Sequence, residues 1–259
     1  MVKGLYTAYT GMIHQEHRMD VLTNNLANAD TNGYKKEGAT AQSFDALLAH
    51  KIKDVTEGYR LAKHIGWNNP GVKIGEGYTD FSQGPMKETG NTFDLALTDK
   101  GFFAVEFVNK KGESSVKYTR DGNFTTDAEG YLRTQDGDWV LNSEGKRVQM
   151  DPIAPETVIN IKGQIIQNGQ VVDTIGVTDF ENYDYLKRYG ENYFEPVEGA
   201  TEAEAPAGIY QGFLETSNMS VVSEMVEMIA VSRAYESNQK VITTIDGTLD
   251  IAANQLGKV

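Results

Sequence analysis

The sequence contains no cysteine, so disulfide bonds and thiolate metal sites are both excluded. Apolar residues never continue for the roughly 20 positions that a membrane-spanning helix needs. Neither an apolar run nor a small-residue cleavage site follows Lys3, so we expect no secretory signal. Basic residues are also scarce, because 24 Lys and Arg against 37 Asp and Glu give a formal charge of −13. Phosphate contacts need a basic surface, so we expect no nucleic-acid partner.

Residues 218–259 carry the strongest pattern in the sequence. Every seventh position is apolar, in the series Val221, Met228, Tyr235, Ile242, Leu249 and Leu256. This repeat predicts a long helix that packs against a partner helix along one narrow seam. The intermediate row, which begins at Met225, is mostly small or polar, whereas flanking faces are apolar, so we expect more than one neighbour. Asn218 or Ser220 can cap the start of this predicted assembly helix.

The beginning of the chain shows a weaker form of the same pattern. Polar residues at Glu16 and Thr23 interrupt an apolar row at helical spacing, which consists of Leu5, Tyr9, Met12, Met19 and Leu26. The row predicts either an ordinary amphipathic helix on a domain core or a second assembly helix. We expect the helix to stop in a run of side-chain amides that includes Asn24, Asn25 and Asn28. Gly33 can then supply a left-handed turn.

The middle of the chain is typical of antiparallel strands. The run 101–108 predicts a strong strand, and several acid–glycine pairs then follow at near-even spacing. These turns predict a meander of short strands up to about Phe180: Asp121-Gly122, Glu129-Gly130, Asp136-Gly137 and Glu144-Gly145. Residues 181–207 are acidic and end in prolines and alanines, so we expect an exposed loop there.

Residues 36–75 are predicted to connect the first helix to the strands. Four apolar residues favour a short helix, namely Phe44, Leu47, Leu48 and Ile52. Glycine, asparagine and proline then break the regularity between Gly58 and Gly71. Two interpretations remain open, a plain surface loop and a connector whose conformation depends on assembly.

Together these patterns predict an α+β fold. Long N- and C-terminal helices would form an antiparallel coiled-coil-like assembly domain, interrupted by a mainly antiparallel all-β domain. The helices should lie antiparallel because the chain leaves and returns through one connection region. The expected boundaries are an N-terminal assembly helix and its stop at 1–35, a connector at 36–75, an all-β outer domain at 76–207, a return connector at 208–217 and a C-terminal assembly helix at 218–259.

Candidate chemical motifs are weak throughout the sequence. Alternating oxygen-bearing side chains before Gly130 resemble a calcium loop, but the glycine and glutamate positions of an EF-hand are not matched. His14 and His17 lie three residues apart without a further histidine in that helix. Carboxylates are plentiful, but no spacing places two of them as a glycosidase pair. We therefore expect no enzyme activity, no cofactor, no metal and no small-molecule substrate.

Three ordered blocks carry a more specific signal: residues 11–28 with 31–35, residues 89–103 with 118–122 and 130–132, and residues 214–218 with 225–238. They contain the motifs Thr31-Asn-Gly-Tyr-Lys35, Tyr118-Thr-Arg-Asp-Gly122 and Leu214-Glu-Thr-Ser-Asn218. These blocks resemble the axial proteins of the bacterial flagellum, a family of rod, hook and hook-associated proteins. The length of the chain is similar to that of a rod protein of the basal body.

The resemblance implies a structural subunit that polymerises through its terminal helices into a helical tube. Such a tube transmits torque from the motor to the hook and allows exported subunits to pass. The implied partners are further copies of the chain in a helical homopolymer, neighbouring rod and hook proteins, and the flagellar type III export apparatus. The implied location is the flagellar basal body in the cell envelope, reached without a cleaved signal peptide. The expected assembly contacts are Leu5, Tyr9, Met12, Met19, Asn24, Asn25, Asn28, Val221, Met228, Arg233, Tyr235, Asn238, Ile242, Leu249 and Leu256.

A second hypothesis belongs to a different class of protein. The β domain could act on cell-wall carbohydrate, with the helical ends serving only as anchors. Deleting both termini would abolish assembly under the first hypothesis and spare peptidoglycan hydrolysis under the second. The residues that resemble the axial family lie in the helices and their connections, which favours assembly.

Overall fold

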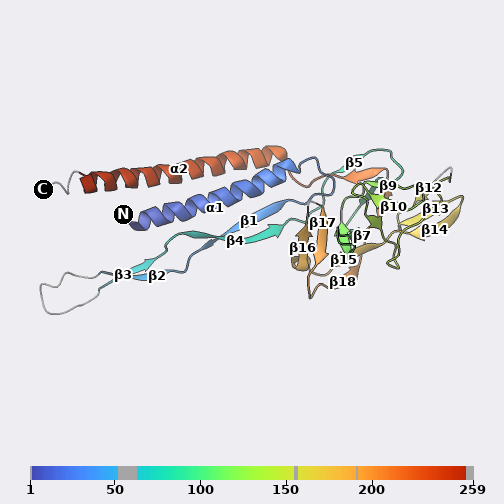
Figure 1. Ribbon diagram of the computed structural model, residues 1–259, viewed down its shortest axis with the longest axis horizontal. Helices are drawn as coiled ribbons and strands as arrows, with labels where there is room; N and C mark the ends of the chain where they lie inside the picture. The colour runs from blue at the N-terminus through green and yellow to red at the C-terminus, as the bar shows by residue number, and fades with distance from the viewer. Residues whose placement is uncertain (1, 52–62, 155–156, 191, 255–259) are drawn as a thin grey trace. The chain divides into compact units, whose positions relative to one another are not determined.

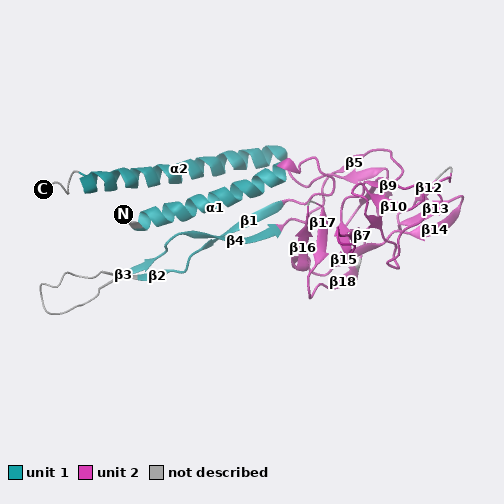
Figure 2. Cartoon of the chain, viewed as in Figure 1, with its two compact units in different colours: residues 1–26, 37–78, 221–259 teal, residues 27–36, 79–220 magenta. Residues whose placement is uncertain are grey.

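A computed structural model describes residues 2–51, 63–154, 157–190 and 192–254 of the protein. They form two compact units (Figure 2). The helical unit comprises residues 1–26, 37–78 and 221–259, and the β unit comprises residues 27–36 and 79–220. The part of the chain that the structure describes holds no helix long and apolar enough to cross a membrane.

Two long helices dominate the helical unit: α1 (Val2–Ala27) and α2 (Val221–Asn254). They run side by side and antiparallel, as the sequence predicts (Figure 1). Arg18 forms an ion pair with Glu227, which lies near the start of α2. Nearer the start of α1, a Cβ added to Gly11 would lie 3.0 Å from the side-chain nitrogen of Asn238. A small residue at this position therefore lets the two helices approach closely.

The residues between the helices differ in part from the expected rows. On α1 the buried positions are Ala8, His14, Leu22 and Asn25, whereas Tyr9 of the predicted row is exposed. On α2 Glu224 and Val231 are buried, whereas the expected intermediate row beginning at Met225 is exposed. The row beginning at Val221 contributes only half-buried residues to this contact, namely Met228, Tyr235 and Ile242. The seam within the chain thus combines this row with one that starts at Glu224.

Residues 37–78 complete the helical unit as paired strands, and the predicted short helix is wrong. The strands are β1 (Glu37–Ser43), β2 (Leu47–Lys51), β3 (Lys63–Asn68) and β4 (Val72–Thr79). β1 pairs with β4, and β2 pairs with β3. Pairing supplies each strand with backbone hydrogen bonds, which overrides the weak helix propensity of the segment that contains Phe44 and Leu48. Ile52, the last residue of the predicted helix, lies outside the described residues.

The β unit is built around a nine-stranded antiparallel sheet. Its main path runs in the order β16 (Leu186–Tyr189), β17 (Tyr193–Pro196), β8 (Ser114–Thr119), β7 (Phe102–Val108), β11 (Trp139–Val140), β10 (Leu132–Thr134) and β9 (Phe124–Thr126). Off this path, β15 (Val177–Phe180) pairs with both β7 and β18 (Glu202–Glu204). A three-stranded sheet follows the order β12 (Thr157–Ile159), β13 (Gln164–Gln167) and β14 (Gln170–Thr174). Two short ladders join β19 (Ile209–Gln211) to β6 (Leu95–Leu97) and β20 (Phe213–Glu215) to β5 (Met86–Glu88).

The core of the β unit lies on both faces of β7, the strand that the sequence predicts most strongly. Phe103 and Val105 point into one apolar cluster, and Phe102 and Ala104 point into the other. This alternation follows from the two-residue period of a strand. Because both faces are covered, residues 102–105 form a continuous apolar run rather than an alternating one.

The prediction of an exposed loop over 181–207 is wrong. This segment contains a short 3₁₀ helix, η1 (Tyr183–Tyr185), followed by strands β16, β17 and β18. Tyr193 and Phe194 are buried, and Phe194 packs its ring 5.5 Å from that of Phe102. Aromatic burial is compatible with the acidic composition because Glu181, Asp184, Glu198 and Glu202 remain exposed.

Candidate functional site: a buried ion cluster and a pair of helices

Three side chains that are far apart in the sequence form an ion cluster inside the β unit. The carboxylate of Glu215 lies 2.6 Å from Lys35 Nζ and 3.2 Å from an Arg120 guanidinium nitrogen. All three side chains are almost completely buried. Two cations around one anion leave this buried group with a formal charge of +1. Burial of charge on this scale is unfavourable unless each ion is closely paired.

Backbone groups complete the pairing of the ion cluster. Gly84 N–H donates to Glu215 Oε1 at 2.8 Å, and Lys35 Nζ donates to Ser82 O at 2.8 Å. Burial lowers the pKa of Lys35, while the adjacent carboxylate of Glu215 opposes that shift. The guanidinium of Arg120 lies over the ring of Phe102. Glu215 therefore holds together strands and loops that come from separate parts of the chain.

Gly33 fixes the backbone beside the ion cluster. It has a φ of +67°, so the left-handed turn predicted for this residue is confirmed. Its N–H donates to Glu215 O at 2.8 Å. A Cβ added at Gly33 would lie 2.4 Å from the backbone nitrogen of Asp121, so a larger residue cannot fit without backbone movement. The segment before Lys35 is thus held against both the Arg120 loop and β20.

Asn218, one of the two residues expected to cap the second helix, bonds segments of the β unit. Its carboxamide oxygen accepts from Lys36 N–H at 2.8 Å, and its nitrogen donates to Asp80 O at 2.7 Å. On the other side of the ion cluster, Arg188 stacks over the ring of Tyr34 and donates to Lys35 O at 3.3 Å. These bonds fasten the segments that lead into and out of the β unit.

Asp121, which follows Arg120 in the sequence, is a half-buried carboxylic acid. Burial raises its pKa to about 6, although hydrogen bonds from Asn123 N–H and the Asn192 side chain act in the opposite direction. Neighbouring Asp136 and Asp94 add a smaller raising effect on the pKa. The side-chain oxygen of Asn192 is buried and lacks a hydrogen-bond partner among the described residues. Asp121 therefore changes charge in a mildly acidic range.

Known protein families match three segments of the sequence. A family described as flagella basal body rod protein matches residues 5–35. The D1 domain of flagellar hook proteins FlgE/F/G matches residues 96–176, and the C-terminal region of basal body rod FlgEFG proteins matches residues 210–256. Each match contains one member of the ion cluster.

Whole-chain relatives decide the family. The flagellar basal-body rod protein FlgF of Caulobacter vibrioides is 32% identical, with 100% of both chains covered. The rod protein FlgG of Bacillus subtilis is 32% identical over 98% of this chain and 99% of its own. The chain belongs to the flagellar basal-body rod protein family. The hook-basal body complex protein FlhO of Bacillus subtilis is 30% identical, again with both chains fully covered. These rod-family relatives carry structural names rather than names of enzymes.

The described part of this rod-family chain contains no group of three or more side chains suited to holding a metal ion. His14 is buried in α1, and burial lowers its pKa, with Arg18 and His17 adding to the effect. Asp127, from the calcium-like run, instead pairs with Arg133 at 2.8 Å and accepts hydrogen bonds from Glu129 N–H and Tyr131 N–H. Turn formation accounts for the acidic pattern.

The residues expected to form assembly contacts fall into three classes of burial. Asn25 is fully buried, where its amide bonds the backbone of Glu37 at 2.8 and 3.0 Å and Glu224 at 3.3 Å. Half-buried residues are Leu5, Met12, Met19, Asn28, Met228, Tyr235, Asn238 and Ile242. Exposed residues are Tyr9, Asn24, Val221, Arg233 and Leu249, while Leu256 lies outside the described residues.

The sequence-based list of functional residues omits the ion cluster. Lys35, Arg120 and Glu215 each stand in a family-like motif, but their separation in sequence gives no indication that they meet. The available signal was the position of each motif at a boundary: Lys35 follows the helix stop, Arg120 ends a strand, and Glu215 precedes the second helix. Charged residues at such boundaries are usually solvated, so burial could not be assigned from sequence.

Glu215→Gln should strongly destabilise the β unit. The substitution keeps the shape of the side chain but leaves the two buried cations without a counterion, which typically costs about 3–5 kcal/mol. The chain has two tryptophans, so a Trp67→Phe background leaves Trp139 of the β unit as the reporter. Guanidinium unfolding followed by Trp139 fluorescence would measure the loss.

Glu144→Gln provides the matched control for this experiment. Glu144 pairs with Lys146 at 2.8 Å, but both side chains are mostly exposed. Solvent screens such a pair, so its loss should barely move the unfolding midpoint. Equal effects of the two substitutions would contradict the role assigned to the ion cluster.

The stability of the β unit should also depend on pH through Asp121. Its pKa is about 6 in the folded chain and about 4 in an unfolded one, so folding favours the protonated form. Stability from this group is therefore present at low pH and is lost as pH rises from about 4 to about 6. Between pH 5 and pH 7.5 the loss should be about 1 kcal/mol.

Asp121→Asn removes this titration while conserving shape. Its new amide group can donate to the partnerless oxygen of Asn192 after that side chain rotates. The difference in unfolding free energy between variant and parent should then change by about 1 kcal/mol between the two pH values. Parallel stability curves for variant and parent would show that Asp121 does not titrate as described.

Proposed function

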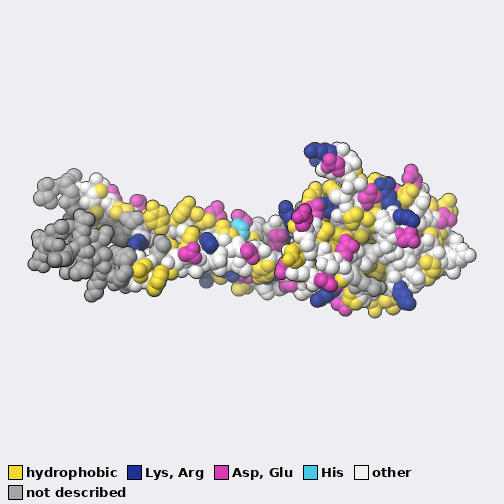
Figure 3. Space-filling model, turned by 90° about the horizontal axis from the view of Figure 1, so that it is seen from below, with side chains coloured by type: hydrophobic (Ala, Val, Ile, Leu, Met, Phe, Trp, Pro, Cys, Tyr) yellow, Lys and Arg dark blue, Asp and Glu magenta, His cyan; other side chains and the backbone are white. Residues whose placement is uncertain are grey.

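We propose that this chain is a structural subunit of the flagellar basal-body rod that polymerises through α1 and α2. The observation that carries the proposal is the apolar surface left open on the helical unit. Hydrophobic side chains reach the surface of this unit among polar and acidic ones (Figure 3). In a chain with a charge of −13, helices that served only as solvated anchors would not need such a surface.

The open apolar surface follows the geometry of a helix. Val222, Val226 and Ile229 occupy positions i, i+4 and i+7 of α2, with exposed fractions of 72%, 62% and 53%. On α1, Tyr6, Tyr9 and Ile13 form a similar exposed stripe. The helix seam already occupies other faces of α1 and α2, so these stripes are available to neighbouring subunits.

The row from Val221 to Leu256 retains its proposed part in these contacts. Met228, Tyr235 and Ile242 are only half-buried by α1, so each keeps surface for another chain. Arg233 and Asn24 are exposed and can add directional hydrogen bonds that fix the register of subunits. Buried Asn25 supports the geometry of the single chain, because its amide bonds within the helical unit.

The assembled form that we propose is a coiled-coil-like helical tube that transmits torque from motor to hook and lets exported subunits pass. Its neighbours would be other copies of this chain and other rod and hook proteins of the basal body in the cell envelope. The type III export apparatus would deliver the chain without cleavage of a signal peptide. The rod-protein names of the relatives favour this structural, non-enzymatic function over a carbohydrate-active one.

Val226→Asp tests the assembly function directly. Val226 is 62% exposed, so the substitution should leave folding of the single chain nearly unchanged, within about 0.5 kcal/mol. A charge buried at every subunit contact of a polymer should prevent incorporation into rods. Purified basal bodies and motility in a strain carrying only the variant would provide the measurement, with circular dichroism as the check on folding.

Gln239→Asp is the matched control because it places the same charge at an exposed polar position of α2. Rods and motility should persist in this variant. Normal rods in the Val226→Asp strain would refute assembly through this face of the helix.

A further inference from the structure

The small sheet β12–β13–β14 has an apolar row on its outer face. Val158 pairs with Ile166, and Ile166 pairs with Val171, so the three side chains form a row across all three strands. Val158 and Val171 are 43% and 55% exposed. The inner face of the same strands carries Ile159 and Ile165, which are buried in the core of the β unit. The sheet is therefore apolar on both sides, which is unusual for an antiparallel sheet with a solvated face.

The outer strand of this sheet exposes aliphatic side chains at an edge that is only partly protected. β14 is the last strand in the order and begins Gln170-Val171-Val172, with both valines exposed. Natural edge strands are usually protected by lysine, proline or a covering segment. A β-bulge beside Ile166, another common protection of edges, interrupts the pairing of β14 with β13. An exposed aliphatic edge of this kind is typical of a surface that another chain covers.

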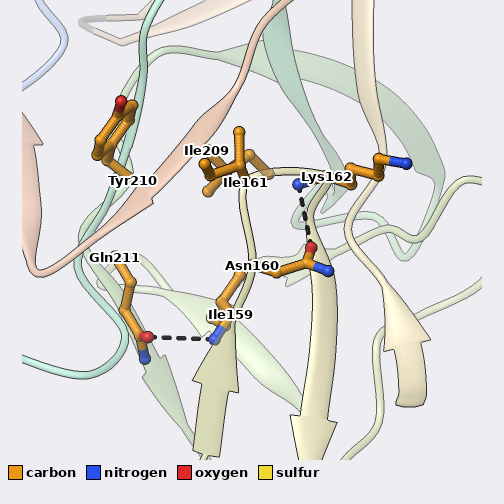
Figure 4. A pocket seen from close by; sticks show the side chains of 7 residues that line it. All are labelled: Ile159, Asn160, Ile161, Lys162, Ile209, Tyr210 and Gln211. Atoms are coloured by element: carbon orange, nitrogen blue, oxygen red, sulfur yellow. Dashed lines mark hydrogen bonds between the residues drawn. The ribbon is translucent and has the colours of Figure 1, made fainter.

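An open pocket of about 440 Å³ adjoins β12 (Figure 4). The side chain of Gln211 fastens β19 to β12, because it accepts from Ile159 N–H at 3.1 Å and donates to Thr157 O at 3.0 Å. Ile161 and Tyr210 line the pocket and are both exposed. The pocket adds further apolar surface at the end of β12.

We propose that this outer face, defined as Val158, Ile166 and Val171 with the adjoining pocket, contacts the β unit of a second copy of the chain. The inference rests on the proposed function, since it concerns subunits in one assembly. It adds a contact surface in the β unit to the helical contacts described above.

Charge is the reason to choose a second copy as the occupant. Residues 157–172 contain one charged side chain, Lys162, whereas the 24% charged fraction of the whole chain would give about four in sixteen residues. Two copies that each carry −13 repel wherever their acidic surfaces meet. An uncharged aliphatic face allows like copies to approach without that repulsion, and a basic partner would gain nothing from it.

Site-specific photo-crosslinking of the full chain tests the proposal. A photoreactive p-benzoylphenylalanine is introduced in place of Val171 in a flagellated strain, and purified basal bodies are irradiated. The expected product is a dimer of the 28.6 kDa chain, in which position 171 is joined to a peptide of the same sequence. A product joined to a different protein, or no product from chains present in basal bodies, overturns the proposal.

Position 116 supplies the control, because Val116 is also an exposed valine on a strand of the β unit, at 46%. The same photoreactive residue there should give at least tenfold less dimer. Equal dimer yields at the two positions would remove the specificity claimed for this face and overturn the proposal. Absence of the unmodified chain from basal bodies is a distinct result, which refutes the proposed function itself.

Discussion

The β unit depends on one buried carboxylate. Glu215 stands between Lys35 and Arg120, which would repel each other inside the protein without it. Strand β20 delivers the carboxylate, the segment after α1 delivers the lysine, and the end of β8 delivers the arginine. A single ionic contact therefore makes the fold of this unit conditional on three parts of the chain meeting correctly. The need to bring these three ions together favours a unique geometry of the β unit over maximal stability.

The helical unit is held together by different interactions. Its two helices are held by a thin apolar seam, by the Arg18–Glu227 ion pair and by the buried amide of Asn25. Much of the remaining apolar surface stays open, including Val226 and Ile229. Helices gain most of their stability from packing, so further contacts would strengthen this unit more than the β unit. The β unit thus has a self-sufficient core, whereas the helical unit keeps apolar surface that its own chain does not cover.

The sequence was informative wherever local periodicity determines structure. The heptad spacing predicted both long helices, and positive φ at Gly33 followed from glycine in an amide-rich helix stop. It failed where distant segments decide the outcome. Residues 36–75 contain ordinary helix formers, yet β1 pairs with β4 and β2 pairs with β3. The acidic composition of residues 181–207 predicted exposure, yet Phe194 in this segment is buried. The ion cluster could not be predicted because no local pattern relates residues 35, 120 and 215.

The row facing α1 includes residues that the sequence pattern does not single out. Apolar residues on α2 occupy several faces, so the rule that seams are apolar does not single out one of them. The buried row includes Glu224, which a hydrophobicity pattern assigns to the outside. Its carboxylate is accommodated because Asn25 donates to it. A polar pair inside a seam cannot be predicted from one helix alone, because its partner lies on the other helix.

The hydrogen bond from Gly33 to Glu215 has a consequence for how proteins of this type can diversify. This hydrogen bond joins the two residues that flank positions 34–214. The two ends of that long segment therefore lie close together. Segments inserted where the chain ends lie close together are tolerated with little effect on the host. Further segments can therefore be inserted between residues 34 and 214 without separating the two ends.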